Sequence, residues 1–98
     1  MEKIEVVIGP AAERELRKLD QNSLRSAVKA IDKLQFDMRP RGVEKIQGHP
    51  GFYRIRVGAM RIVYYPMSNH RVAVLVIADR KNAYKANSDL ETRLKHAG

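Results

Sequence analysis

The chain of 98 residues contains no cysteine, so neither a disulfide framework nor a thiolate metal site can form. This absence is typical of a protein that works in a reducing cytosol. Histidine is scarce as well, and His49, His70 and His96 are isolated, without metal-ligand spacing. We therefore expect no zinc site and no metal cofactor.

Long apolar runs are also missing. The longest, VAVLVIA over 72–78, is far shorter than the roughly 20 residues that a membrane-spanning helix needs. The first residues, MEKIE, are charged and lack the apolar centre of a signal peptide. We expect a soluble, cytoplasmic protein without a membrane partner.

Acidic residues are scarce in the middle of the chain, and the net charge of +8 arises there. Residues 1–38 carry seven basic and seven acidic side chains, residues 39–85 carry ten and two, and residues 86–98 carry two of each. A local basic excess beside a balanced remainder indicates a surface for a polyanion, most simply a nucleic acid. The alternative is that these lysines and arginines only make the surface soluble.

Length and composition are those of one globular unit. Hydrophobic residues make up 44% of the chain and charged residues 31%, which is too apolar for a chain that stays disordered. A chain of this length is enough for one modest core. We expect a single domain over residues 1–98.

Two amphipathic helices are predicted in the first part of the chain. A short β-branched strand, KIEVVI over 3–8, leads to Gly9-Pro10, and proline is well tolerated at the first helical position. The second helix ends at MRPRG, because a proline disfavours helix at the residue before it. Its apolar face is formed by Leu24, Ala27, Val28, Ile31 and Leu34.

From Glu44 onward the pattern predicts strands. FYRIRV, MRIVYYPM and HRVAVLVIA are β-branched and aromatic, and Gly58-Ala59 between the first two suits a type II′ hairpin. The capping-box pattern of Ser88 to Glu91 predicts a short C-terminal helix over about 88–95. The order predicts an α+β fold of two layers, with two helices on one face of a mostly antiparallel sheet and the other face open.

The hairpin YRIRVGAMRIVYY places arginines on one face of the sheet. If Gly58 and Ala59 form the turn, Arg56 lies opposite Arg61, and Arg54 lies on the same face. Opposed like charges destabilise a strand pair by ~0.2–1 kcal/mol. We interpret this face as a site for an anion and the opposite, apolar face as core.

The next strand ends in ADRKNAY, which brings Arg80, Lys81 and Tyr84 toward the same region. Arginine binds phosphate bidentately and a tyrosine can stack on a base, so the set suits a single-stranded nucleotide. Tyr84 could instead close the edge of the core, and His49 could be an ordinary turn residue. No glycine-rich phosphate loop, nucleophile elbow or adjacent carboxylate pair is present.

Four features together resemble the RelE branch of the RelE/ParE toxin superfamily: GPAAERELRKL, the hairpin FYRIRVGAMRIVYY, VAVLVIADRKNAY and the spacing between them. The resemblance covers Lys3 to about Lys85. It implies a RelE-like β-α-α-β-β-β(-α) fold and a ribosome-dependent endoribonuclease that cuts messenger RNA by attack of a ribose 2′-oxygen on the adjacent phosphate. ParE-type members share the fold and poison DNA gyrase, which is the alternative function. A plain RNA-binding module is a third.

The resemblance also implies roles for individual residues. Arg54 and Arg56 match two basic strand residues, Arg61 would stabilise charge on the scissile phosphate, Arg80 would serve the leaving oxygen, and Tyr84 would stack on or orient the nucleotide. Arg56 departs from members that use a lysine as general base, because a guanidinium with a pKa above ~12 is a poor base. Either Arg56 acts only electrostatically while the ribosome, Tyr84 or Lys81 assists proton transfer, or turnover is weak.

Further basic residues are expected to bind the RNA, namely Arg41, Lys45, Lys81 and Lys85. The implied partners are the 30S A site of the ribosome, messenger RNA and a cognate antitoxin. The antitoxin would cover the basic face and displace the C-terminal helix, which at about eight residues is marginal alone.

Overall fold

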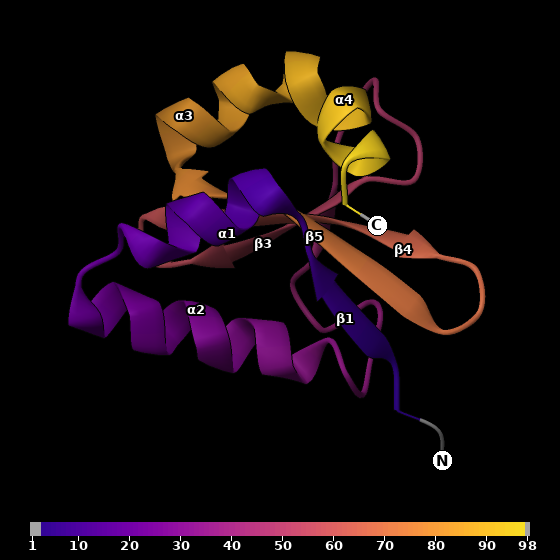
Figure 1. The fold of residues 1–98 in the computed structure, drawn as a ribbon, viewed down its shortest axis with the longest axis horizontal. Coiled ribbons are helices and arrows are strands. Elements are labelled where there is room, and N and C mark those ends of the chain that lie inside the picture. The colour runs from indigo at the N-terminus through magenta and orange to yellow at the C-terminus, as the bar shows by residue number, and fades with distance from the viewer. Residues whose placement is uncertain (1–2, 98) are drawn as a thin grey trace.

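The computed structural model describes residues 3–97 and shows an α+β fold built on one sheet (Figure 1). The strands lie in the order β1-β5-β4-β3-β2, with β1 parallel to β5 and the other pairs antiparallel. The predicted fold class is confirmed, and the short β2, α3 and the 3₁₀ helix η1 are additions. The elements are β1 (Glu5–Ile8), α1 (Pro10–Arg17), α2 (Gln21–Lys33), β2 (Glu44–Lys45), β3 (Tyr53–Val57), β4 (Met60–Met67), β5 (Arg71–Asp79), α3 (Arg80–Lys85), η1 (Ala86–Asp89) and α4 (Leu90–Lys95).

One face of the sheet packs against the N-terminal helices, as predicted. Buried Ala27, Ile31 and Leu34 from α2 and its C-terminal end meet the apolar face of the β3–β4 hairpin. The prediction was wrong for Val28, which is exposed. The position of Val28 fits the apolar face of the helix, but Val28 lies at the edge of that face. Only Ala27, Ile31 and Leu34 are buried against the sheet. The residues of this core on the hairpin are Tyr53, Met60, Ile62 and Tyr64, with Ile55 and Val57 packed at its margin.

The opposite face is partly covered, so the expectation of a fully open face was wrong. The C-terminal helices lie over it (Figure 1), and fully buried Leu90 belongs to a second core with Val63 and Ala83. A register shift between Val63 and Tyr64 leaves Leu75 of β5 without a direct partner, and Leu75 also joins this second core. β5 is therefore buried on both faces, as its continuous apolar run predicted.

Aspartate side chains cap the N-termini of two helices. Asp20 caps α2 by accepting a hydrogen bond from the Ser23 amide at 2.8 Å, which lowers the pKa of this carboxyl. Asp79 caps α3 in the same way through the Asn82 amide. The predicted capping box of Ser88 to Glu91 does not form. Ser88 lies within η1, its hydroxyl donates to the Lys85 carbonyl at 3.2 Å, and α4 begins without a side-chain capping hydrogen bond.

An ion pair joins α4 to α1 at the edge of β5 that β1 leaves uncovered. Glu15 Oε1 accepts hydrogen bonds from the Ile77 amide at 2.9 Å and from Arg93 Nη1 at 3.0 Å. Arg93 Nη1 also donates to the Leu75 carbonyl at 2.9 Å. The two side chains thus satisfy β5 backbone groups where the strand pairing ends.

Removing Glu15 should destabilise the fold by about 1–3 kcal/mol, because Glu15→Ala leaves the Ile77 amide without its acceptor and removes the carboxylate partner of Arg93. Urea unfolding followed by circular dichroism measures the change. Glu13→Ala, on the same helix but in an exposed ion pair with Arg17, should change stability by less than about 0.5 kcal/mol. Equal effects of the two substitutions would contradict the role of Glu15.

Within residues 3–97, no helix combines the length and the apolar character needed to cross a membrane.

Candidate nucleic-acid interface

The β3–β4 hairpin has the predicted register. Arg56 lies opposite Arg61, and Val57 lies opposite Met60. Gly58 has a φ of 62°, which a glycine adopts without strain at the first turn position. Because paired residues point to the same side, Arg54, Arg56 and Arg61 lie on the face away from α2.

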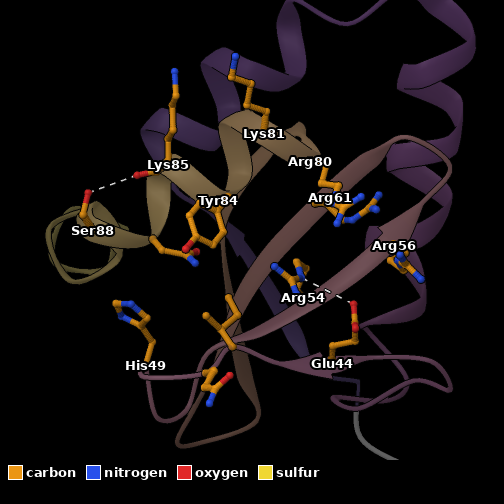
Figure 2. Close-up of a pocket in the computed structure, with 13 residues that line it drawn as sticks. Glu44, His49, Arg54, Arg56, Arg61, Arg80, Lys81, Tyr84, Lys85 and Ser88 are labelled. Atoms are coloured by element: carbon orange, nitrogen blue, oxygen red, sulfur yellow. Dashed lines mark hydrogen bonds and ion pairs between the residues drawn. The ribbon is translucent and has the colours of Figure 1, made fainter.

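That face forms a groove of about 1500 Å³ between the hairpin and the C-terminal helical segment (Figure 2). Its volume exceeds the ~300–1000 Å³ of common small-molecule sites and has room for more than one nucleotide. We call it the arginine groove. It is lined by Glu44, Ile46, Gln47, His49, Arg54, Arg56, Arg61, Arg80, Lys81, Tyr84, Lys85, Asn87 and Ser88.

Arg61 is held in place by the hairpin itself. Its side chain is only 7% exposed, and Nη1 donates to the carbonyls of Gly58 at 2.9 Å and Met60 at 3.0 Å. These carbonyls compensate part of the cost of burying the charge. The guanidinium therefore has a fixed position at the groove before any ligand binds.

Arg54 lies beside an acidic residue that the sequence analysis did not assign to the site. Glu44 on β2 is the register partner of Arg54, and Arg54 Nε lies 3.7 Å from Glu44 Oε1. This distance is too long for a hydrogen bond, and Arg54 Nε has no hydrogen-bond partner among the described residues. Glu44 and Asp79 are the acidic residues of the basic segment 39–85. Glu44 forms an ion pair with Arg54, and Asp79 caps α3.

The α3 helix supplies the opposite wall. Arg80, Lys81 and Lys85 line the groove, and the ammonium groups of the two lysines point away from the arginines in Figure 2. Tyr84 is 72% exposed and its ring turns into the groove, so the alternative that Tyr84 closes the core edge is wrong. The neighbouring Ala83 is the α3 residue that enters the core.

Arg41 and Lys45 lie outside the arginine groove. Lys45 is paired with Tyr53, so it points to the other side of the sheet from Arg54. Arg41 lines a separate hollow of about 450 Å³ beside α2, together with Lys29 and Lys33. Arg56 borders both hollows, so basic side chains continue from the groove onto α2.

Polar residues that the sequence did not mark also lie at the groove. His49, interpreted as an ordinary turn residue, lies in a turn that lines the groove, and its ring packs edge-on against Phe52 with the ring centroids 6.4 Å apart. Gln47, Asn87 and Ser88 lie there too. No local pattern marks these residues, because the loop between β2 and β3 and the 3₁₀ helix η1, which are far apart in the sequence, bring them together.

In the part of the chain that the structure describes, no group of three histidine, aspartate or glutamate side chains is placed to hold a metal ion.

The fold and the groove define a small α+β protein with a preformed basic surface. Comparison with solved structures gives the same fold. The E. coli toxin RelE, as a mutant in the free state, superposes with a TM-score of 0.76 at 21% identity, covering 94% of this chain and 98% of RelE. The RelBE2 toxin–antitoxin complex from Mycobacterium tuberculosis gives a TM-score of 0.70 at 24% identity, with 82% and 94% covered. The archaeal RelE–RelB complex from Pyrococcus horikoshii gives 0.68 at 24% identity, with 79% and 94% covered.

The sequence identifies the family. The model of the family described as "ParE toxin of type II toxin-antitoxin system, parDE" matches residues 6–84. The chain therefore belongs to this family, and it is a type II toxin of the RelE/ParE superfamily with a RelE-like structure. No curated protein matches the chain by sequence.

Proposed function

We propose that this toxin is a ribosome-dependent endoribonuclease that cuts messenger RNA in the 30S A site and so inhibits translation. The observation that carries the proposal is the arginine groove, in which Arg61 is fixed by backbone carbonyls beside Arg54, Arg56 and Arg80. A surface that only contacts a protein has no need of arginines directly opposed across a hairpin. The cytoplasm, where ribosomes translate, is the proposed location.

The proposed reaction is an internal displacement within the messenger RNA and consumes no co-reactant. The ribose 2′-oxygen forms a bond to the adjacent phosphorus, the bond from phosphorus to the 5′-oxygen breaks, and the products are a 2′,3′-cyclic phosphate and a 5′-hydroxyl. Arg61 stabilises the charge that develops on the phosphate, and Arg80 serves the leaving oxygen. Arg54 and Arg56 contribute electrostatically.

Proton transfer is assigned to groups other than the guanidinium groups, which stay protonated in proteins. Of the side chains that line the groove, Glu44 and His49 can accept the proton that the 2′-hydroxyl loses, and the group so protonated, or a water molecule, supplies the proton that the leaving 5′-oxygen takes up. Positioning by the ribosome supplies the alignment of the 2′-oxygen, so free messenger RNA is a poor substrate.

The proposed protein partner is a cognate antitoxin, since the solved complexes similar to this fold are named as toxin–antitoxin pairs. We propose that the antitoxin covers the arginine groove and displaces the segment 88–95. Leu90 and Arg93 hold this segment against the sheet, so displacement has to replace their contacts. Hydrogen exchange in this segment that stays as slow as in β4 after antitoxin binding would count against displacement.

Gyrase inhibition is the second candidate, and the match to the ParE family favours it. In that case the arginine groove would bind the antitoxin or gyrase rather than RNA. A supercoiling assay with purified gyrase tests this function directly.

The deciding experiment adds the purified toxin to a translating extract and maps messenger RNA 5′ ends. We expect new ends within ribosome-bound codons, none in RNA without ribosomes, and unchanged gyrase activity. Intact messenger RNA together with inhibited supercoiling would contradict the nuclease function and support gyrase inhibition instead.

A further inference from the structure

A second basic hollow lies beside the arginine groove, between α2 and the outer edge of β3. Its volume is about 450 Å³, and Lys29, Lys33 and Arg41 line it together with Arg56. We call it the α2 hollow. Three consecutive residues of β3, over 55–57, line it as well, so the hollow lies along the edge of this strand rather than on one face of the sheet.

Arg56 joins the two hollows because β3 is an edge strand at this point. The short β2 pairs only with Tyr53 and Arg54, so among the described residues no strand covers the outer edge of β3 from Ile55 onward. Arg56 and Arg61 follow the hydrogen-bonded pair next to the tight turn, so they form a non-hydrogen-bonded pair and the Arg56 amide faces this edge. The guanidinium and the amide of one residue are therefore both available at the α2 hollow.

The α2 hollow is lined by cations that no acid neutralises. The described residues that line it include neither a carboxylate nor an aromatic ring, whereas the arginine groove has Glu44 and Tyr84. Within residues 3–97, none of Lys29, Lys33 and Arg41 forms an ion pair. Like charges around one hollow repel one another, and a bound anion removes that repulsion. Because the hollow has no ring to stack on a base, the anion that fits it is the phosphate backbone of a nucleic acid.

The backbone on both sides of the hollow is fixed. Lys29 and Lys33 are four residues apart on α2, so their side chains leave the same face of the helix with Cβ atoms about 5–6 Å apart. The loop that carries Arg41 is tied to the sheet, because the Met38 carbonyl accepts a hydrogen bond from the Tyr64 hydroxyl at 2.7 Å. The cations therefore project from a rigid frame, at a spacing comparable to that of successive phosphates along an extended strand.

We propose that the α2 hollow is a phosphate-binding subsite for the messenger RNA strand as it leaves the arginine groove. Arg56 holds the phosphate at the rim that the two hollows share. Lys29, Lys33 and Arg41 bind the phosphates that follow. The inference rests on the proposed function, because the strand that enters the hollow is the one held in the arginine groove. Arg56 lines both hollows, so a strand that passes it keeps its phosphate contacts without a gap.

The first test measures binding of 2′-O-methylated RNA, which cannot be cut, by fluorescence anisotropy at several salt concentrations. It compares a trinucleotide with the same trinucleotide extended by three nucleotides on its 5′ side or on its 3′ side. One of the two extensions should tighten binding about tenfold. Lys29→Ala/Lys33→Ala should remove that gain and lower the salt slope by about 1.4, at ~0.7 for each phosphate contact of a single strand. Uncharged methylphosphonate linkages in the extension should remove the gain for the wild-type toxin as well.

The matched control is Lys18→Ala/Lys95→Ala, which removes two exposed lysines that line neither hollow. It lowers the net charge by the same amount and should keep the gain from the extension. The subsite would be overturned if neither extension adds affinity, if the gain survives in Lys29→Ala/Lys33→Ala, or if the control loses the gain equally.

Cleavage in translating extracts separates the subsite from the nuclease. A toxin that cuts nothing but shows the lysine-dependent gain keeps the subsite as an RNA-binding site and loses the proposed activity. A toxin that cuts messenger RNA and shows no gain keeps the activity and loses the subsite. If Lys29→Ala/Lys33→Ala lowers cleavage on ribosomes although no extension tightens binding, the α2 hollow contacts ribosomal RNA instead, and the messenger RNA subsite is overturned.

Discussion

Arg61→Ala should lower ribosome-dependent cleavage about 100- to 1000-fold, the typical loss when a preorganised donor to a transition-state charge is removed. The expectation follows from the position of Arg61, which two hairpin carbonyls fix before the RNA arrives. A group that is already oriented needs no reorganisation when charge develops on the phosphate. Primer extension on messenger RNA from a translating extract measures the cleavage rate.

The controls separate lost chemistry from lost structure. Arg61→Lys keeps the charge but loses the planar fork, so it should recover only part of the activity. Arg25→Ala removes an exposed arginine of α2 outside the groove and should cut at the wild-type rate. The three variants should have similar circular dichroism spectra. Cleavage by folded Arg61→Ala at the wild-type rate would remove the role that we assign to this residue.

Leu90→Ala should reduce the free energy of unfolding by about 2–5 kcal/mol, the usual cost of truncating a buried leucine. Leu90 is fully buried in the second core, between α4 and the face of the sheet that the sequence analysis left open. Urea unfolding gives the change, provided that the slope of the transition stays the same.

Val28→Ala is the matched comparison, because Val28 is a helical residue of similar character that is exposed rather than buried. It should change stability by less than about 0.5 kcal/mol. A small effect of Leu90→Ala, similar to that of Val28→Ala, would mean that α4 contributes little to the folded state in solution.

The arrangement of arginines on the β3–β4 hairpin could be predicted from local sequence patterns. Alternation along YRIRV and the two-residue turn at Gly58 placed Arg56 opposite Arg61, and the structure has this pairing. The period of two residues and the geometry of a tight turn are local properties, so they can be read without knowing the rest of the fold. The same reasoning placed the apolar side of the hairpin against α2.

The other wall of the groove needed the tertiary structure. The prediction that the strand ends within ADRKNAY is confirmed, because β5 ends at Asp79. The helix α3 that Asp79 caps was not predicted, and this helix turns Tyr84 into the groove. Lys45 was assigned to the RNA surface on its charge, but its register with Tyr53 turns it to the other face. Val28 fitted the helical stripe and is nevertheless exposed.

The sequence by itself determined the α+β class, the register of the hairpin and the position of the basic excess, because each depends on neighbours within a few residues. Only the tertiary structure decided that α4 covers part of the second face, that Glu44 faces Arg54 and that Asn87 lies in the same groove as Gln47. These contacts join segments that are far apart in the chain. Which residues meet in these contacts depends on how the helices and loops pack on the sheet, and this packing cannot be predicted from a local pattern in the sequence.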